Sequence, residues 1–144
     1  MTAAVEFWCD MTEDERPAVL DDMLAFNSGA DARPQVWKIV IENDDQGAWG
    51  AGPAVYLDAG LDGDRGYVRW TDRSGVYVLD PQDARVFVSD PVAYYDPHGV
   101  QGAPPVRHHV NGITVAAAVS QALRTRRRPT MVVWVPLGSV AASA

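Results

Sequence analysis

The feature that most constrains the fold of this chain is a series of short β-type segments separated by Asp/Gly turns. Apolar, β-branched and aromatic residues gather at positions 54–59, 66–70, 75–79, 85–89 and 92–95. The turns at 62–66 and 72–75 are rich in aspartate, which bonds its own backbone, and in glycine, which supplies positive φ. Segments at this spacing predict an antiparallel β-meander.

Two amphipathic helices are expected to flank this series. The first follows a capping box formed by Thr12 and Glu15, carries Pro17 in its first turn, and ends near residues 27–29. Its apolar stripe consists of Val19, Leu20, Met23 and Leu24. The second helix repeats apolar residues at the i, i+3, i+4, i+7, i+8 spacing, which here gives Val115, Ala118, Val119, Ala122 and Leu123. Four arginines between 124 and 128 close it before Pro129.

Three further strands complete the predicted fold, at residues 3–9, 36–42 and 130–135. Residues 97–112 contain three prolines and three glycines and are expected to form a long loop. The resulting order is β-α-β-β-β-β-β-β-α-β. It predicts an α+β fold, a single domain over residues 1–144 in which two helices pack against one curved, mainly antiparallel sheet.

The charge of the chain limits its partners. Nineteen acidic residues against 12 basic ones give a formal net charge of −7. That charge repels a polyanion, so direct nucleic-acid binding is a poor hypothesis. The arginines near 124–128 are better explained by the negative end of the helix dipole, since no aromatic residues are interleaved with them for base stacking.

Targeting signals and redox chemistry are also limited by the sequence. The first ten residues carry two acids and no basic residue, which does not suit a secretory signal, and no apolar run reaches membrane-spanning length. We therefore expect a cytoplasmic protein with no membrane contact. The single cysteine, Cys9, excludes an internal disulfide and a cysteine-based zinc cluster, and we expect no cofactor.

Catalytic signatures are weak. His108 and His109 are adjacent, so an extended chain points them to opposite faces, and His98 lies ten residues away in the same expected loop. We expect these histidines to be solvated and to bind no metal. Motifs for a serine or cysteine nucleophile or a phosphate-binding loop are missing, and nearly all carboxylates lie in turns. The chain is therefore predicted not to be an enzyme.

Several landmarks occur in an order that resembles the Imm1 family of bacterial immunity proteins. They are the turn Leu61-Asp62-Gly63-Asp64-Arg65-Gly66, the strand Tyr67-Val68-Arg69-Trp70, the stretch Val92-Ala93-Tyr94-Tyr95-Asp96, an Ile113-led helix and the segment Arg128-Pro129-Thr130-Met131-Val132-Val133-Trp134. The resemblance is strongest over residues 36–135. The regions 43–53 and 97–112 depart from the family pattern in being longer and richer in proline and glycine.

The resemblance implies an antidote rather than a catalyst. Imm1-like proteins are found especially in actinobacteria, beside polymorphic toxins, many of which carry nucleic-acid deaminase domains, and they neutralise these toxins by binding. A toxin that acts on nucleic acid needs a basic cleft, and an acidic antidote is electrostatically complementary to it. The expected partner is therefore a cognate toxin, most simply a basic cytidine or adenosine deaminase.

Candidate toxin-binding residues combine exposed acids with aromatic anchors. Asp44 and Asp45 lie near Trp49 in the glycine-rich region 43–53, although Trp49 also suits packing on the sheet. The other candidates are Asp62, Asp64, Tyr94, Tyr95 and Asp96, of which the tyrosines also suit the core. Two alternatives stay open: a small-ligand or regulatory binding domain with a pocket beneath the sheet, and a hydrolase that uses loop aspartates and histidines.

Overall fold

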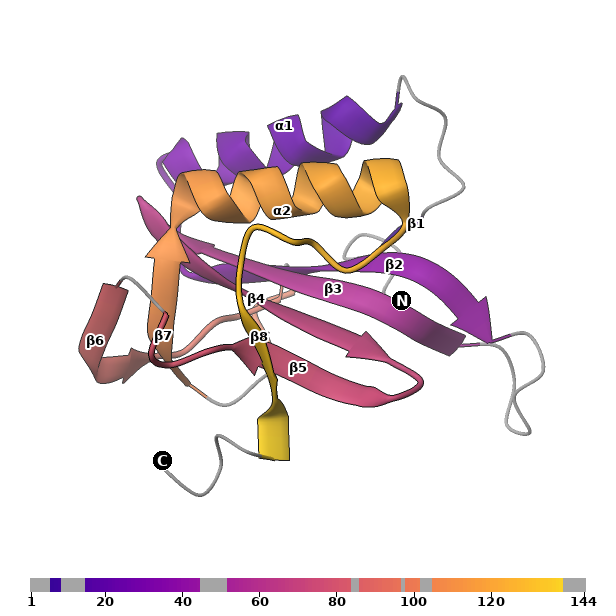
Figure 1. The fold of residues 1–144 in the computed structure, drawn as a ribbon. Helices are drawn as coiled ribbons and strands as arrows, with labels where there is room; N and C mark the ends of the chain where they lie inside the picture. Colours follow the sequence, from indigo (N-terminus) through magenta and orange to yellow (C-terminus); the bar gives the residue numbers. More distant parts are fainter. Residues whose placement is uncertain are drawn as a thin grey trace.

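Two helices lie side by side over one face of a curved sheet (Figure 1). The computed structural model describes residues 6–8, 15–44, 52–83, 86–96, 98–101 and 105–138. The elements are β1 (Glu6–Trp8), α1 (Glu15–Ser28), β2 (Gln35–Asp44), β3 (Gly52–Asp62), β4 (Arg65–Asp72), β5 (Gly75–Leu79), β6 (Val86–Val92), β7 (Val106–Asn111), α2 (Gly112–Thr125) and β8 (Trp134–Pro136). The α+β fold predicted from the sequence is confirmed.

The sheet divides in the middle of β4. Its main path is β1-β2-β3-β4-β5-β8, antiparallel except for the parallel pair β1 and β2. Beyond β3, the second half of β4 pairs with β5 from Arg69 to Asp72, whereas its first residues, Arg65 and Gly66, pair with β7. β7 in turn carries β6. The strands β5 and β7 therefore leave a fork beside the middle of β4.

The main core lies between the helices and the sheet. Along β2, Trp37, Ile39 and Ile41 alternate toward the helices and are buried, as period-2 patterning predicts. All five apolar residues predicted for α2 are buried, which confirms that stripe. Leu24 of α1 departs from the prediction because it is 40% exposed, and α1 instead places Phe26 edge-to-face on Trp37.

A short crossing segment, residues 93–96, covers the opposite face of the sheet. Tyr94 packs edge-to-face on Tyr67 of β4, with ring centroids 4.7 Å apart, and also lies beside Gly60 of β3. Tyr95 then forms a parallel bridge to Gln35 at the start of β2. A Cβ atom at Gly60 would lie 2.3 Å from the Tyr67 ring, so glycine is required for both rings to lie against the strand.

His109 fastens this crossing segment to β7. Its Nδ1 lies 3.1 Å from the Arg107 carbonyl oxygen, which only accepts, so Nδ1 carries the proton and donates. The Nε2 atom therefore accepts from the Tyr94 hydroxyl at 2.9 Å. Burial lowers the pKa of His109, which maintains the neutral ring that this pairing needs. The expectation of a solvated loop histidine is wrong for this residue.

The largest differences from the predicted elements lie in the second half of the described chain, while in the first half β2 and β3 extend to Asp44 and Gly52, beyond the strands expected at 36–42 and 54–59. The strand expected at 92–95 is wrong, because β6 ends at Val92 and the chain then crosses the sheet instead of running along it. The loop expected at 97–112 contains β7, whose Val-Arg-His-His-Val-Asn sequence hides its alternation behind two adjacent histidines. The closing strand is shorter than 130–135 and lies at Trp134–Pro136.

The N-terminal predictions are tested only in part. The strand expected at 3–9 is described at Glu6–Trp8, and Pro17 lies in the first turn of α1 as predicted. Thr12 of the capping box and Cys9 fall outside the described residues. Within the part of the chain that the structure describes, no helix combines the length and apolarity needed to cross a membrane.

The hydrogen bond between Tyr94 and His109 gives a direct test of the crossing segment. Replacing Tyr94→Phe leaves the buried Nε2 atom of His109 without a donor, so the free energy of unfolding should fall by about 1–3 kcal/mol. Urea titration measures this change. Tyr56→Phe, on the same face of the sheet, is the matched control and should change it by less than about 0.5 kcal/mol. Equal effects of the two variants would contradict the pairing.

Candidate functional site

The candidate toxin-binding residues lie at two opposite ends of the sheet. Asp44 ends β2 and pairs with Gly52, whereas Asp62 ends β3 ten residues later, so the two positions are roughly 33 Å apart along the strand. We call these the β2–β3 end and the β3–β4 end. A standard interface of about 800 Å² per partner is about 30 Å across, so one centred at either end leaves the other uncovered.

At the β2–β3 end, only part of the prediction falls on described residues. Asp44 is the last residue of β2, while Asp45 and Trp49 lie outside the described residues. The same end of the sheet holds the β4–β5 turn, where Arg73 forms an ion pair of 3.0 Å with Glu42. Acidic and basic side chains are therefore mixed here.

The β3–β4 end contains Asp62, Asp64, Tyr95 and Asp96. Asp62 accepts hydrogen bonds from Nε and Nη2 of Arg65 at 3.0 and 2.8 Å, and both side chains are about three-quarters to two-thirds buried. Asp62 therefore neutralises its neighbour in the turn. Asp96 uses its Oδ1 atom to accept from the backbone N–H groups of His98 and Val100, which shapes the turn that follows the crossing segment.

Of the three candidate acids at this end, Asp64 is the exposed one. Its turn contains Gly63 at φ +66° and is held from both sides by the helices. The Asn27 side chain of α1 both donates to and accepts from the Gly63 backbone, at 2.7 and 3.0 Å. The Gly112 N–H at the start of α2 donates to the Asp64 carbonyl at 2.8 Å. A carboxylate on such a fixed turn is well positioned to steer a basic partner.

Ile113 lies immediately after that contact and is 84% exposed. Leu24 is exposed too, one helical turn before Asn27. We define the turn surface as Asp64, Ile113 and Leu24. The sequence interpretation missed Ile113 as a contact residue, although its position two residues before Val115 places it off the apolar stripe of α2 and so indicated exposure.

The two adjacent tyrosines have different surroundings. Tyr94 is only 1% exposed and cannot reach a partner, so we remove it from the proposed contact residues. Tyr95 is half-buried, and its backbone exchanges hydrogen bonds with Pro34 and Val36 at 3.1 and 3.0 Å. Its main described role is to attach the crossing segment to β2.

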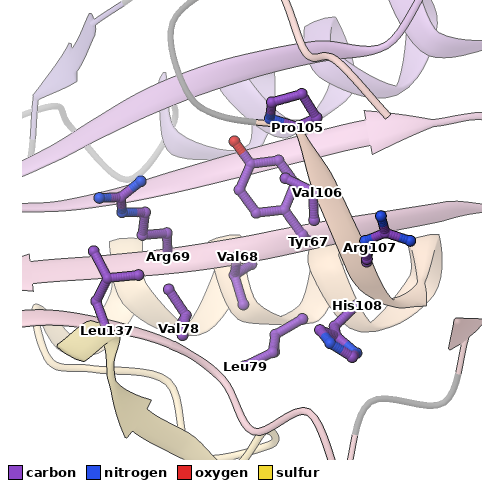
Figure 2. A pocket seen from close by; sticks show the side chains of 10 residues that line it. All are labelled: Tyr67, Val68, Arg69, Val78, Leu79, Pro105, Val106, Arg107, His108 and Leu137. Carbon is purple, nitrogen blue, oxygen red and sulfur yellow. The ribbon is translucent and has the colours of Figure 1, made fainter. Parts of the chain in front are cut away.

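A pocket of about 220 Å³ opens in the fork between β5 and β7 (Figure 2). Its described lining comes from β4, β5, β7 and the chain after β8. The lining residues are Tyr67, Val68, Arg69, Val78, Leu79, Pro105, Val106, Arg107, His108 and Leu137. It arises because no strand fills the space beside residues 67 and 68 of β4.

Asp58 of β3 lies on the same face of the sheet as Tyr67 and Arg69 of β4, and two cations flank it. The strand register places it opposite Lys38 of β2 and Arg69 of β4. Burial raises the pKa of the Asp58 carboxyl to about 6, and the opposing effect of Lys38 and Arg69 does not fully offset it. The charged carboxylate therefore destabilises the native state at neutral pH.

Metal chemistry finds no support among the described residues, where no three His, Cys, Asp or Glu side chains gather around one point. His108 and His109 point to different surroundings, as predicted for adjacent residues on a strand: His108 lines the fork pocket and His109 bonds Tyr94.

The four arginines at and after the end of α2 lie at the opposite end of that helix from the turn surface. All four are exposed, and the guanidinium of Arg128 stacks over the Tyr77 ring at 4.7 Å. Because α2 ends in these arginines, their positive charges lie at the negative end of the helix dipole. The dipole interpretation of the arginine cluster therefore suits the structure.

The raised pKa of Asp58 predicts a pH-dependent gain in stability for Asp58→Asn. In the native protein the Asp58 carboxyl binds its proton more tightly than in the unfolded chain. Protonation of Asp58 therefore stabilises the native state at low pH, and this stabilisation is lost as the pH rises from about 4 to 6. The amide mimics the protonated form. Relative to the natural protein, the variant should gain about 2 kcal/mol of unfolding free energy between pH 4.5 and 7.5.

Urea titrations at those two pH values measure the gain. Asp83→Asn, at an exposed acid in the β5–β6 turn, is the control for the substitution of an acid by its amide. His109 titrates equally in all three proteins and cancels from the comparison. If Asp58→Asn and the natural protein differ in stability by the same amount at both pH values, the view that the Asp58 carboxylate is buried and poorly compensated is wrong.

A comparison with models of protein families assigns the chain to one family. The model of the family described as Immunity protein Imm1 matches residues 11–136, which include α1, α2 and the whole sheet except β1. The match therefore begins well before residue 36, where the resemblance seen in the sequence begins. No curated protein matches the chain. The chain belongs to the Imm1 immunity protein family, and that role implies a cognate toxin as partner.

Proposed function

We propose that this Imm1 protein neutralises its cognate toxin by binding and covering it, and that the toxin is a nucleic-acid deaminase acting on cytidine or adenosine. The observation that carries the proposal is the family match over residues 11–136. The deaminase chemistry follows from the sequence resemblance, since many toxins paired with Imm1-like proteins have that activity. Binding alone accounts for such a role, so we assign no catalytic residue.

Charge supports a basic partner. The chain has a net charge of −7, and its exposed acids in the described part are Asp21, Asp22, Asp31, Glu42, Asp64, Asp83 and Asp90. A nucleic-acid deaminase must hold phosphates with basic side chains, and an acidic antidote accelerates its own encounter with such a cleft. Fast association matters because free toxin damages the cell that makes it.

We place the toxin contact on the turn surface, at the β3–β4 end. Asp64 is exposed on a turn that both helices hold, so its charge has a defined position. Ile113 supplies an aliphatic side chain that loses most of its water contact when a partner covers it. An acid that steers and an apolar group that anchors form the usual division of work at a protein interface.

Co-expression with the toxin encoded beside this gene tests the function. The protein should restore growth of cells that express the toxin, form a complex with it after purification, and suppress deamination of a cytidine- or adenosine-containing oligonucleotide. Absence of both the complex and the rescue would overturn the immunity role. Rescue from a toxin without deaminase activity would overturn only the proposed target.

Two substitutions on the turn surface should alter different rate constants. Asp64→Lys should slow association about tenfold at low salt and weaken its dependence on salt, because it removes steering charge. Ile113→Ala should mainly raise the dissociation rate, by about fivefold or more, because it removes buried apolar area. Surface plasmon resonance with the purified toxin measures both.

Matched substitutions away from this surface serve as controls. Asp83→Lys changes the net charge equally, and Met131→Ala truncates another exposed apolar side chain. Both should leave the kinetics close to those of the natural protein. Equal effects of the paired variants would move the contact away from the turn surface.

The β2–β3 end is the alternative contact. If the toxin binds there, charge reversal at Asp44 and Asp45 slows association, and Trp49→Ala raises the dissociation rate. We expect all three variants to bind normally, because an interface centred on the turn surface leaves that end uncovered. The same kinetic measurement decides between the two ends, and weakened binding only in these variants would overturn our placement.

A further inference from the structure

We propose that two copies of this chain associate through the side of the molecule formed by the segment between α2 and β8 and by the turn after β5. We call this side the return surface and define it as Arg128, Met131, Val133, Asp80 and Asp83. It has a cation at one end, apolar side chains in the middle and acids at the other end, so it is complementary to itself. Neither the toxin nor the turn surface takes part in this association.

The segment between α2 and β8 has a fixed position. After α2 the chain turns back beneath the helix and descends to β8, as the yellow trace in Figure 1 shows. The Gln121 side chain of α2 donates to the Thr130 hydroxyl and accepts from the Thr130 N–H, both at 3.1 Å. The Asp80 N–H donates to the Val133 carbonyl at 2.9 Å. Because helix and sheet both hold the segment, it needs little further ordering when a partner binds.

Two apolar side chains of this segment face solvent. Met131 and Val133 are 40% and 49% exposed, whereas Val132 between them is buried. Pro129 is buried too, and its carbonyl accepts from the indole N–H of Trp134 at 2.7 Å. The fold therefore uses one side of the segment for its core and leaves two apolar side chains on the other side. Covering them releases water, which favours association.

Arg128 forms the basic end of the return surface. Its guanidinium is exposed and lies over the Tyr77 ring at 4.7 Å, which fixes its position. Asp72 is near enough to interact electrostatically with Arg128, but its carboxylate accepts hydrogen bonds from Trp70 and Ser74. No described acid forms a salt bridge with Arg128. Stacking leaves the edge of the guanidinium able to donate to a carboxylate of another molecule.

Asp80 and Asp83 form the acidic end. Together with Met131 and Val133 they line a hollow of about 320 Å³, and no described residue that lines it is basic. Asp83 is exposed, while Asp80 is half-buried and accepts from the Gln82 N–H at 3.0 Å. The hollow thus places two carboxylates beside apolar side chains and has no described cation of its own. A guanidinium from a second copy suits it.

The spacing of the two ends suits a two-fold dimer. Tyr77, under Arg128, and Asp80 are three residues apart, which is roughly 10 Å along an extended strand. Met131 and Val133 follow Arg128 along the chain toward Asp80. A two-fold axis through these apolar side chains places the basic end of each copy against the acidic end of the other. The net charge of −7 opposes association in any orientation that does not pair opposite charges, so this orientation is selected.

Sedimentation equilibrium of the full-length protein tests the association. At physiological ionic strength the natural protein should form dimers with a Kd of about 100 μM or tighter. Met131→Ala should raise this Kd about fivefold or more, because it removes apolar area that both copies bury. Ile113→Ala truncates an exposed aliphatic side chain of the turn surface and is the control, with an unchanged Kd. A natural protein that stays monomeric up to about 1 mM, or equal effects of the two variants, would overturn the proposal.

An exchange of charge between the two ends identifies the surface. Asp83→Lys and Arg128→Glu each create two like-charge contacts in their own dimer, so each should weaken association at least about tenfold. An equimolar mixture of the two variants should recover the natural Kd to within about threefold, because both contacts of the mixed dimer again join opposite charges. Asp22→Lys, on α1, changes the net charge as Asp83→Lys does and should dimerise normally. Dimers unchanged in both variants, or a mixture that does not recover, would overturn the pairing.

The toxin is the competing occupant of the return surface. We expect Met131→Ala and Asp83→Lys to leave the toxin kinetics unchanged, because a dimer of this strength is dissociated at the nanomolar concentrations of such measurements. Toxin binding that both variants weaken, together with a natural protein that stays monomeric, would overturn the dimer and assign the return surface to the toxin.

Discussion

The arrangement of the whole sheet depends on one buried contact, in which the Tyr94 ring lies over Gly60 and against Tyr67 while its hydroxyl is held by His109. This contact connects β3, β4 and β7 through a segment that belongs to none of them. Because the crossing segment must pass from β6 to the start of β2, it carries the chain away from β4. β7 then reaches β4 at only two residues, and the fork is the result.

The helices pack on the other face of the sheet. Their termini lie at the β3–β4 turn at one end and at the arginine cluster at the other. α1 ends and α2 begins beside the β3–β4 turn, so a single turn receives hydrogen bonds from both helices. α2 then runs along the sheet to a terminus crowded with arginines, where Arg128 stacks on Tyr77. These bases lie at the negative end of the helix dipole. A chain that is acidic as a whole therefore has a surface on which charge depends strongly on position.

These two features give the turn surface and the fork pocket different structural origins. The toxin contact that we propose uses a turn held by both helices and the exposed aliphatic side chain of Ile113, a combination that suits a protein partner. The fork leaves a pocket of about 220 Å³ between β5 and β7.

Patterns of local origin were predictable from the sequence, and long-range crossings were not. The α+β class, the buried stripe of α2 and the Trp37, Ile39 and Ile41 face of β2 follow from periods of 3.6 and 2 residues, which a chain carries in its own order. The family, too, was visible in the order of its landmarks. The positions of Tyr94, His109 and β7 were not predictable, because a strand that contains two histidines resembles a loop until a tyrosine 15 residues earlier supplies its hydrogen-bond partner. The sequence determined which residues could be acidic, apolar or extended. Only the tertiary structure decided that Asp62 is neutralised by Arg65, that Ile113 is exposed beside Asp64, and that Asp44 lies at the far end of the sheet, since each of these facts depends on which strand lies next to which.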